Sequence, residues 1–133
     1  MKRKQVWRYY CDFCRKAGCS AGHLKRHEAS CTANPLRVCL AHGKLSLSGR
    51  AQRPMTELIG ALDGSGADAE VAVLRDLADG CPICILAAIR QSHRQMSADE
   101  DGPGFGYPFS FRTELKAAWE RYNTMQQEED HYP

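Results

Sequence analysis

The chain has 133 residues, of which 43% are hydrophobic and 26% are charged; this composition indicates one ordinary globular domain, or two very small ones, and excludes wholesale disorder. No apolar run approaches the roughly 18–20 residues that span a membrane, and the basic start has no apolar signal core, so we expect neither a membrane protein nor a secreted precursor. The net charge of +2 conceals an asymmetry, because residues 1–53 carry 12 Lys and Arg against 2 acids and residues 54–133 carry 6 against 14. A basic first half is typical of a protein that meets a polyanion, unless the two halves pack together and cancel their charges.

The first half of the chain predicts a short strand, a helix and a polar loop. Aromatic and β-branched side chains at residues 6–10 favour a short strand that runs into the first cysteine. Ser20 can cap a helix over residues 21–29. The polar residues 44–53 indicate a loop or a short ribbon.

The second half predicts helices. Pro54 suits the first position of a helix over residues 55–62. Apolar side chains at helical spacing indicate another helix over residues 67–78. We expect a third helix to open at the Cys-Pro-Ile-Cys motif and to run to about residue 96.

The last part of the chain predicts a flexible loop followed by an amphipathic helix. Gly, Pro and acidic residues are concentrated in residues 97–109, as is typical of a mobile loop. Ser110 can cap the final helix, whose tail over residues 126–133 we expect to fray. One face of this helix carries an apolar stripe, which packs on the chain's own core or contacts a partner: Phe111, Leu115, Ala118, Trp119 and Tyr122. The segments that we expect are therefore residues 1–36, 37–96, 97–109 and 110–133.

Seven cysteines without a secretory signal favour metal ligands over a disulfide framework. Two of them flank a tight turn and are followed by a helix that carries His and Cys four residues apart, on one face. Three thiolates and one imidazole form a closed tetrahedral set that suits Zn²⁺. The ligands predicted for this first site are Cys11, Cys14, His27 and Cys31. In an alternative set, His23 or Cys19 takes the place of Cys31.

The spacing of these four residues resembles that of the Cys2His2 zinc finger, in its variant with Cys as the last ligand. The resemblance covers residues 9–31 and implies a ββα unit with one structural zinc ion. Tyr9 falls where the family has an aromatic, two residues before the first cysteine, and Leu24 falls at the family's core leucine. Gly18 stands where the family has its core aromatic, four residues after the second cysteine, so we expect a thin apolar core that depends strongly on its metal.

The resemblance also implies a way of binding DNA. In DNA-reading fingers, the first turn of the helix enters the major groove. The base-facing positions would be Ser20, His23 and Arg26, and Arg26 suits a bidentate contact with guanine. Basic side chains nearby would contact phosphates: Arg8, Arg15, Lys16, Lys25 and the tail formed by Lys2, Arg3 and Lys4. In the alternative interpretation, all of these residues form only a solvated basic face.

Two further pairs of ligands predict a second structural zinc site. Cys39 and His42 are separated by two residues, as are Cys81 and Cys84, and a shared metal would clamp residues 54–96 onto the basic half. This arrangement is similar to zinc ribbons and treble-clef sites, and it leaves Cys19 without a role. Two alternatives stay open for the Cys-Pro-Ile-Cys motif: unligated thiols, or a redox pair, which would need a preceding strand instead of the helix expected here.

Taken together, these features favour a small, mostly α protein of the α+β class, with an N-terminal ββα-like finger, a second zinc site and a helical C-terminal part. We expect two structural Zn²⁺ per chain. We expect no enzyme and no small-molecule substrate, because both ligand sets are complete without water and the usual nucleotide, hydrolase and metalloprotease motifs are missing. The expected function is nucleic-acid binding through the basic half, with DNA favoured over RNA. The alternative is a protein-interaction or virion-associated scaffold that uses the C-terminal helix.

A wider resemblance concerns the stretches HEASCTANPLRVC and GCPICILAAIRQ. They resemble small uncharacterised zinc-finger proteins of bacteriophages and prophages. The resemblance implies a phage protein in the cytoplasm of a bacterial or phage-infected cell, and it implies no activity. In a eukaryotic cell, the expected compartment would be the nucleus.

Overall fold

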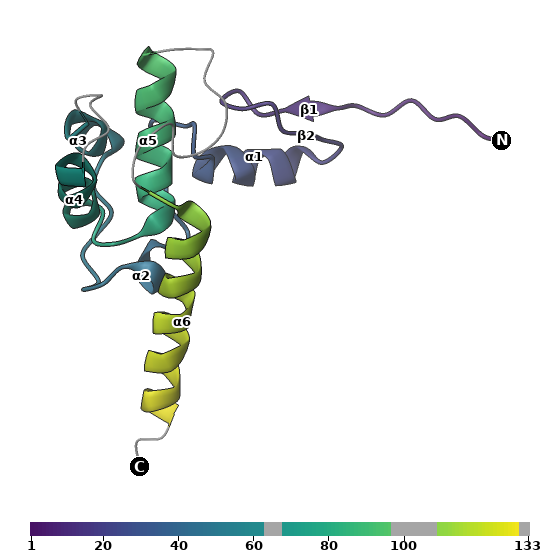
Figure 1. Ribbon diagram of the computed structural model, residues 1–133. Helices are drawn as coiled ribbons and strands as arrows, with labels where there is room; N and C mark the ends of the chain where they lie inside the picture. Colours follow the sequence, from purple (N-terminus) through teal and green to yellow (C-terminus); the bar gives the residue numbers. More distant parts are fainter. Residues whose placement is uncertain (63–67, 97–108, 131–133) are drawn as a thin grey trace.

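The computed structural model describes residues 1–62, 68–96 and 109–130, and this part of the chain is mostly helical with one small sheet (Figure 1). Its elements in chain order are β1 (Tyr9–Tyr10), β2 (Ala17–Gly18), α1 (Ala21–Ser30), α2 (His42–Leu45), α3 (Met55–Gly60), α4 (Asp68–Leu77), α5 (Pro82–Met96) and α6 (Phe111–Asp130). Among these helices, none combines the length and the apolar character that crossing a bilayer requires.

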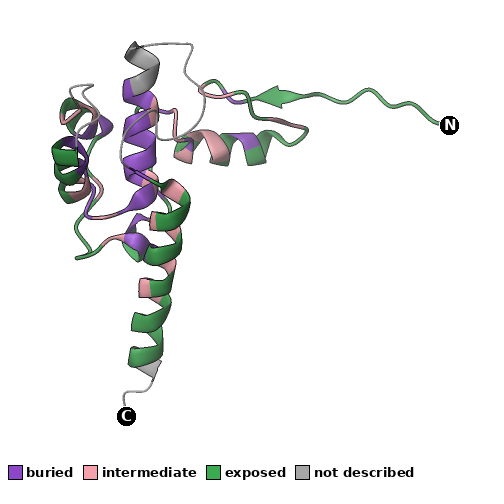
Figure 2. Ribbon diagram, viewed as in Figure 1, coloured by how far each residue is buried: buried purple, intermediate pink, exposed green. Residues whose placement is uncertain are grey.

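Helix α5 is the centre of the helical body. Helices α3 and α4 pack along one side of it, and α2 and α6 pack near its first turns (Figure 1). The middle of α5 is apolar on all sides, because neighbours cover it from several directions (Figure 2). Helices α2, α3, α4 and α6 add buried apolar side chains to the same core: Leu45, Met55, Leu58, Val71, Leu74 and Ala118.

The hairpin and α1 form a second, smaller unit. Tyr9 pairs with Gly18 and Tyr10 with Ala17 in antiparallel register, and α1 packs against both strands. The buried apolar residues of this finger unit are few: Cys11, Leu24 and Cys31. Figure 1 shows the finger unit projecting to one side of α5, with the N-terminal segment extending still further from the body.

The chain that follows α1 attaches the finger unit to the helical body. Gln91, buried in α5, donates through Nε2 to the carbonyls of Thr32 and Asn34, at 2.9 and 3.0 Å. Arg90 donates to Thr32 Oγ1 at 3.1 Å. Because buried polar groups of this kind need their partners, these bonds fix where the finger unit lies on α5.

Most of the predicted helices are present. Ser20 caps α1 as expected, since its Oγ accepts a hydrogen bond from the His23 amide at 3.3 Å. Helices α3 and α4 differ from the predicted ranges 55–62 and 67–78 only at their ends, within the described residues. Helix α5 begins inside the Cys-Pro-Ile-Cys motif, and α6 begins directly after Ser110.

Other predictions about local structure were wrong. The strand expected over residues 6–10 is limited to β1, because the two residues of β2 offer no backbone partner to residues 6–8. The loop expected over residues 44–53 begins inside α2, whose Leu45 is completely buried in the core. Helix α6 continues through residues 126–130, where fraying was expected.

Two expectations concern residues outside the described ranges. The flexible loop expected over residues 97–109 falls there except for Phe109, which is buried against the core. The last three residues of the expected frayed tail, 131–133, fall there as well.

Candidate metal centres

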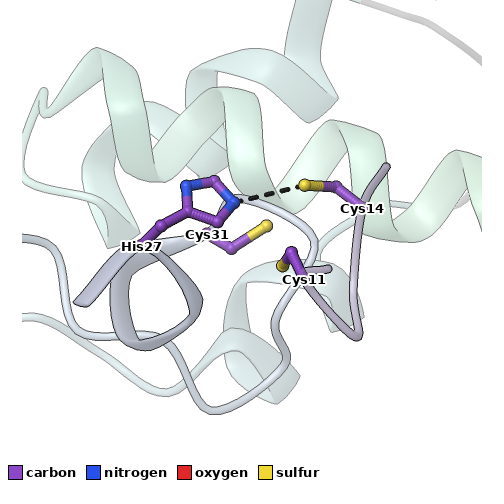
Figure 3. Close-up of side chains that lie close together, drawn as sticks. All are labelled: Cys11, Cys14, His27 and Cys31. Carbon is purple, nitrogen blue, oxygen red and sulfur yellow. Dashed lines mark hydrogen bonds between the residues drawn. The ribbon is translucent and has the colours of Figure 1, made fainter. Parts of the chain in front are cut away.

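The four residues predicted for the first site lie together. Their ligand atoms are all within 4.8 Å of one another: Cys11, Cys14, His27 and Cys31. Figure 3 shows these side chains converging from the hairpin and from the end of α1, with His27 Nε2 facing Cys14 Sγ at 3.2 Å. Cys19 and His23, the alternative ligands, are exposed and do not belong to this group.

Local backbone structure positions the ligands of this first centre. Cys11 and Cys14 flank a turn in which the amides of Phe13 and Lys16 approach Cys11 Sγ and Cys14 Sγ, each at 3.4 Å. Such N–H donors favour thiolate over thiol. Burial raises the pKa of Cys31, the residue that ends α1, to about 11, so cation binding there would release a proton.

Gly18, at the family's core aromatic position, is approached closely by Leu24. A Cβ on Gly18 would lie 2.9 Å from Leu24 Cδ2, so the buried Leu24 side chain already fills the space above the hairpin. Phe13, which lies between the first two cysteines, is the aromatic that packs on this small core. The core is thin, as expected, and the four ligands make up much of it.

A second cluster of thiols is buried in the helical body. The sulfur atoms of Cys39, Cys81 and Cys84 all lie within 4.8 Å of one another, and Cys39 Sγ is 3.8 Å from Cys81 Sγ. Cys39 arrives from the chain that follows the finger unit, whereas Cys81 and Cys84 surround the start of α5. The fold therefore joins the two distant motifs, as the sequence predicted.

His42, the fourth predicted ligand, lies beside this cluster. Its ring nitrogens are not within 4.8 Å of all three sulfur atoms. Its Nδ1 lies 3.4 Å from Cys84 Sγ, and its Nε2 lies 2.8 Å from the carbonyl oxygen of Arg50. A metal-bound histidine commonly donates its second ring N–H to a carbonyl. The orientation of His42 is therefore compatible with that of a ligand, although the structure does not bring its ring within 4.8 Å of all three sulfurs.

Arg37 is a member of the second centre that the sequence analysis missed. Arg37 is only 5% exposed. Its guanidinium donates two hydrogen bonds to the Ser30 carbonyl, at 3.2 Å each, and lies 4.0 Å from Cys84 Sγ. A buried guanidinium stays charged and requires compensation. Its presence indicates that the thiol cluster carries negative charge.

The thiols of the second centre share protons. Hydrogen bonds from Cys81 and Cys84 lower the pKa of Cys39 far below that of an ordinary thiol. The same contacts raise the pKa of Cys81 and Cys84, since both donate to the thiolate. A divalent cation would take over the role of those protons and allow all three sulfurs to be thiolates.

Asp79 is a second residue that the sequence analysis missed. Its buried carboxylate accepts hydrogen bonds from Ser48 N, Ser48 Oγ and Arg50 N, at 3.1, 2.8 and 3.0 Å. Burial opposes ionisation, but these donors hold the pKa of Asp79 below its usual value. Because Arg50 also supplies the carbonyl that meets His42, Asp79 positions His42 through this loop. The only signal in the sequence is the Asp-Gly pair at residues 79–80, which is typical of a turn after a helix.

All residues proposed to contact nucleic acid are exposed on the finger unit or beside it: Arg8, Arg15, Lys16, Ser20, His23, Lys25 and Arg26. Lys16, Ser20 and His23 line one open hollow of about 300 Å³ between β2 and the start of α1. Ser20 Oγ is already engaged as the cap of α1, so it has less freedom to meet a base than the side chains of His23 and Arg26.

Comparison with known proteins gave no match to a family model, a curated protein or a solved structure. The expected resemblance to phage and prophage zinc-finger proteins therefore receives no support from relatives. What the chain does have is a mostly helical fold with two Cys/His clusters that could each hold a metal ion.

Proposed function

We propose that both clusters hold structural zinc and that the finger unit binds nucleic acid. A tetrahedral zinc ion, with bonds of about 2.3 Å to sulfur and 2.0–2.1 Å to nitrogen, sets its ligands about 3.8 Å apart for S···S and about 3.5 Å for S···N. The corresponding separations here are 3.8 Å for Cys39–Cys81, 3.2 Å for Cys14–His27 and 3.4 Å for Cys84–His42. Thiolate and imidazole ligands with these separations suit zinc.

Charge balance supports zinc at the buried centre. Three thiolates around a divalent cation leave one net negative charge, and the Arg37 guanidinium supplies the compensating positive charge. The first cluster has four protein ligands, which is typical of structural zinc, and the second has three cysteines with His42 beside Cys84. The proposed role of the metal is therefore structural.

The single observation that carries nucleic-acid binding is the exposed basic surface of the finger unit. Its hairpin and helix present Arg15, Lys16, Lys25 and Arg26, and the adjoining N-terminal segment adds further cations. The finger unit also carries two acids, Asp12 and Glu28, which its cations outnumber; the Glu28 carboxylate accepts a hydrogen bond from the Asp12 amide at 3.1 Å. Within the described residues, an exposed concentration of cations on a projecting unit matches a polyanionic partner.

The test measures binding of the zinc-loaded chain to labelled duplex and single-stranded DNA and RNA between about 50 and 200 mM salt. If four phosphates are contacted, affinity should fall roughly 100-fold over this range. Arg15→Ala, which removes an expected phosphate contact, should weaken binding and reduce the salt slope by about 1.

Arg112→Ala is the matched control, because Arg112 is an exposed arginine on α6, outside the basic half. It should leave both the affinity and the salt slope unchanged. Equal losses in the two variants, or an affinity that does not respond to salt, would contradict the proposed basic interface.

The alternative function, a protein-interaction scaffold, relied on the apolar stripe of α6. Phe111, Leu115 and Trp119 pack against the chain's own core, which makes less of this stripe available to a partner. Nucleic-acid binding is therefore the function that the geometry favours. Retention of a partner by the intact chain after nuclease treatment would favour the scaffold instead.

A further inference from the structure

The N-terminal segment of the chain exposes aromatic side chains to an unusual degree. Trp7 is 83% exposed, Tyr10 63% and Tyr9 40%, whereas the second tryptophan, Trp119, packs against the core. Exposed aromatic clusters on a monomer commonly mark a binding surface. The segment is therefore a candidate site in its own right, distinct from the helix of the finger unit.

Cations are interleaved with these aromatic residues. Residues 2–10, which we call the aromatic–basic segment, include no acid and four cations: Lys2, Arg3, Lys4 and Arg8. Figures 1 and 2 show the segment as an exposed, extended run that leaves the hairpin and points away from the helical body.

The spacing of the rings suits unpaired bases. In an extended chain, residues two apart point the same way and are separated by about 6.6 Å. Trp7 and Tyr9 are two positions apart in this extended segment, so we expect a spacing of this size, about twice the 3.4 Å rise between stacked bases. One base fits between two such rings, whereas the faces of a base in a duplex are already covered by its neighbours.

We infer that the aromatic–basic segment binds single-stranded nucleic acid, with Trp7, Tyr9 and Tyr10 stacking on bases while the cations contact phosphates. This inference rests on the nucleic-acid function proposed above and specifies its substrate as unpaired strands. A membrane surface also attracts aromatic and basic residues, but peptides that lie in that interface are typically amphipathic helices that satisfy their own backbone. Residues 1–8 adopt no helix.

The experiment uses the full zinc-loaded chain with oligo(dT), oligo(U), a duplex of matching length and vesicles containing anionic lipid. Trp7→Ala and Trp7→Leu should weaken binding to the single strands between about 5-fold and 150-fold, because neither side chain offers a stacking face. Trp7→Phe, which keeps a ring, should retain most of the affinity. The oligo(dT) and oligo(U) arms distinguish DNA from RNA as the natural strand.

A direct readout comes from tryptophan fluorescence. With Trp119→Phe, Trp7 is the only tryptophan, and its emission should be quenched by the single strands and not by the duplex. If Trp119→Phe fails to fold, the affinities of the Trp7 variants in the otherwise natural chain still decide the question, since Trp7 is exposed and its replacement spares the core.

The outcomes separate this inference from the proposed function. Salt-dependent binding that is identical for Trp7→Ala and the natural chain would overturn the inference and leave the proposed function standing. Failure to bind any nucleic acid would remove both. A change in Trp7 emission with vesicles, and none with oligonucleotides, would overturn the inference in favour of a membrane surface.

Discussion

At the scale of single residues, the buried carboxylate of Asp79 connects the loop after α2 to the second metal centre. It faces donors from Ser48 and Arg50, and its own backbone has a φ of 51°. Asparagine tolerates this backbone conformation, so Asp79→Asn changes the charge and the acceptor capacity without straining the chain. It places an amide N–H₂ opposite groups that are themselves donors.

We therefore expect Asp79→Asn to lower the free energy of unfolding by about 1–3 kcal/mol, measured by urea denaturation of the metal-bound chain. Asp76→Asn is the control. The Asp76 side chain is 78% exposed and meets Arg50 only at 3.7 Å, so this change should be worth less than about 1 kcal/mol. If the two substitutions lowered the free energy of unfolding equally, the hydrogen bonds to the charged Asp79 carboxylate would not contribute to stability as proposed.

At the scale of elements, the turn between α4 and α5 is set by Gly80. Its φ is +73°, and its amide donates to the Arg75 carbonyl at 2.9 Å, which closes the end of α4 and aims the chain at Cys81. A Cβ at this position would lie 2.7 Å from Leu47 Cγ. Both the backbone conformation and the close approach of Leu47 therefore require glycine.

Gly80→Ala should destabilise the chain by more than the 1–2 kcal/mol expected of the left-handed conformation alone, because Leu47 must also move. Thermal unfolding followed by circular dichroism measures the effect. Gly43→Ala, within α2, is the matched control: nothing lies within 4 Å of its added Cβ, and alanine favours a helix, so the melting temperature should stay or rise. A larger loss from Gly43→Ala would contradict this account of the turn.

The elements that local sequence specifies were predicted well. Helix α1 follows its Ser20 cap, and α4 and α5 follow their apolar spacing and the Cys-Pro-Ile-Cys motif. Helix α2 was missed because four residues are too few to show a helical period. Its Leu45 is fixed by the core and by Arg121 of α6, which donates to the Leu45 carbonyl across 76 positions of sequence. Such long-range contacts leave no local pattern.

At the scale of the whole molecule, the sequence predicted which cysteine and histidine motifs lie close together. It did not predict the side chains that stabilise the second centre. All four ligands of the first centre follow from spacing, since they lie in one short unit. In the second centre, the three cysteines were predicted, whereas Arg37 was not, because its burial depends on how Ser30 and Cys84 approach each other in the fold. Nothing in the sequence distinguishes a buried arginine from the many exposed cations of the basic half.

The two centres occupy different cores, and this difference has a measurable consequence. Cys39, Cys81 and Cys84 lie in the main core with residues of α2 to α6, whereas the finger unit buries only three apolar residues, two of them ligands. Loss of metal from the finger unit should unfold that unit alone. Loss of metal from the second centre should destabilise the whole helical body. The buried thiolates beside Arg37 would then lose the cation that balances their negative charge.

Three serine variants test this difference. Cys14→Ser should reduce the bound metal from two ions per chain to one, with most of the helical circular-dichroism signal and its main thermal transition retained. Cys84→Ser should also lose one ion but lower the main transition steeply, since structural metal contributes up to about 10–16 kcal/mol of folding free energy in small units. Cys19→Ser, at an exposed cysteine outside both clusters, should keep both ions and the natural melting curve. If Cys14→Ser and Cys84→Ser lowered the main transition equally, this account would be wrong, and the two centres would belong to one cooperative unit. Arg37 and the Gln91 contacts would then join them more tightly than their separate cores imply.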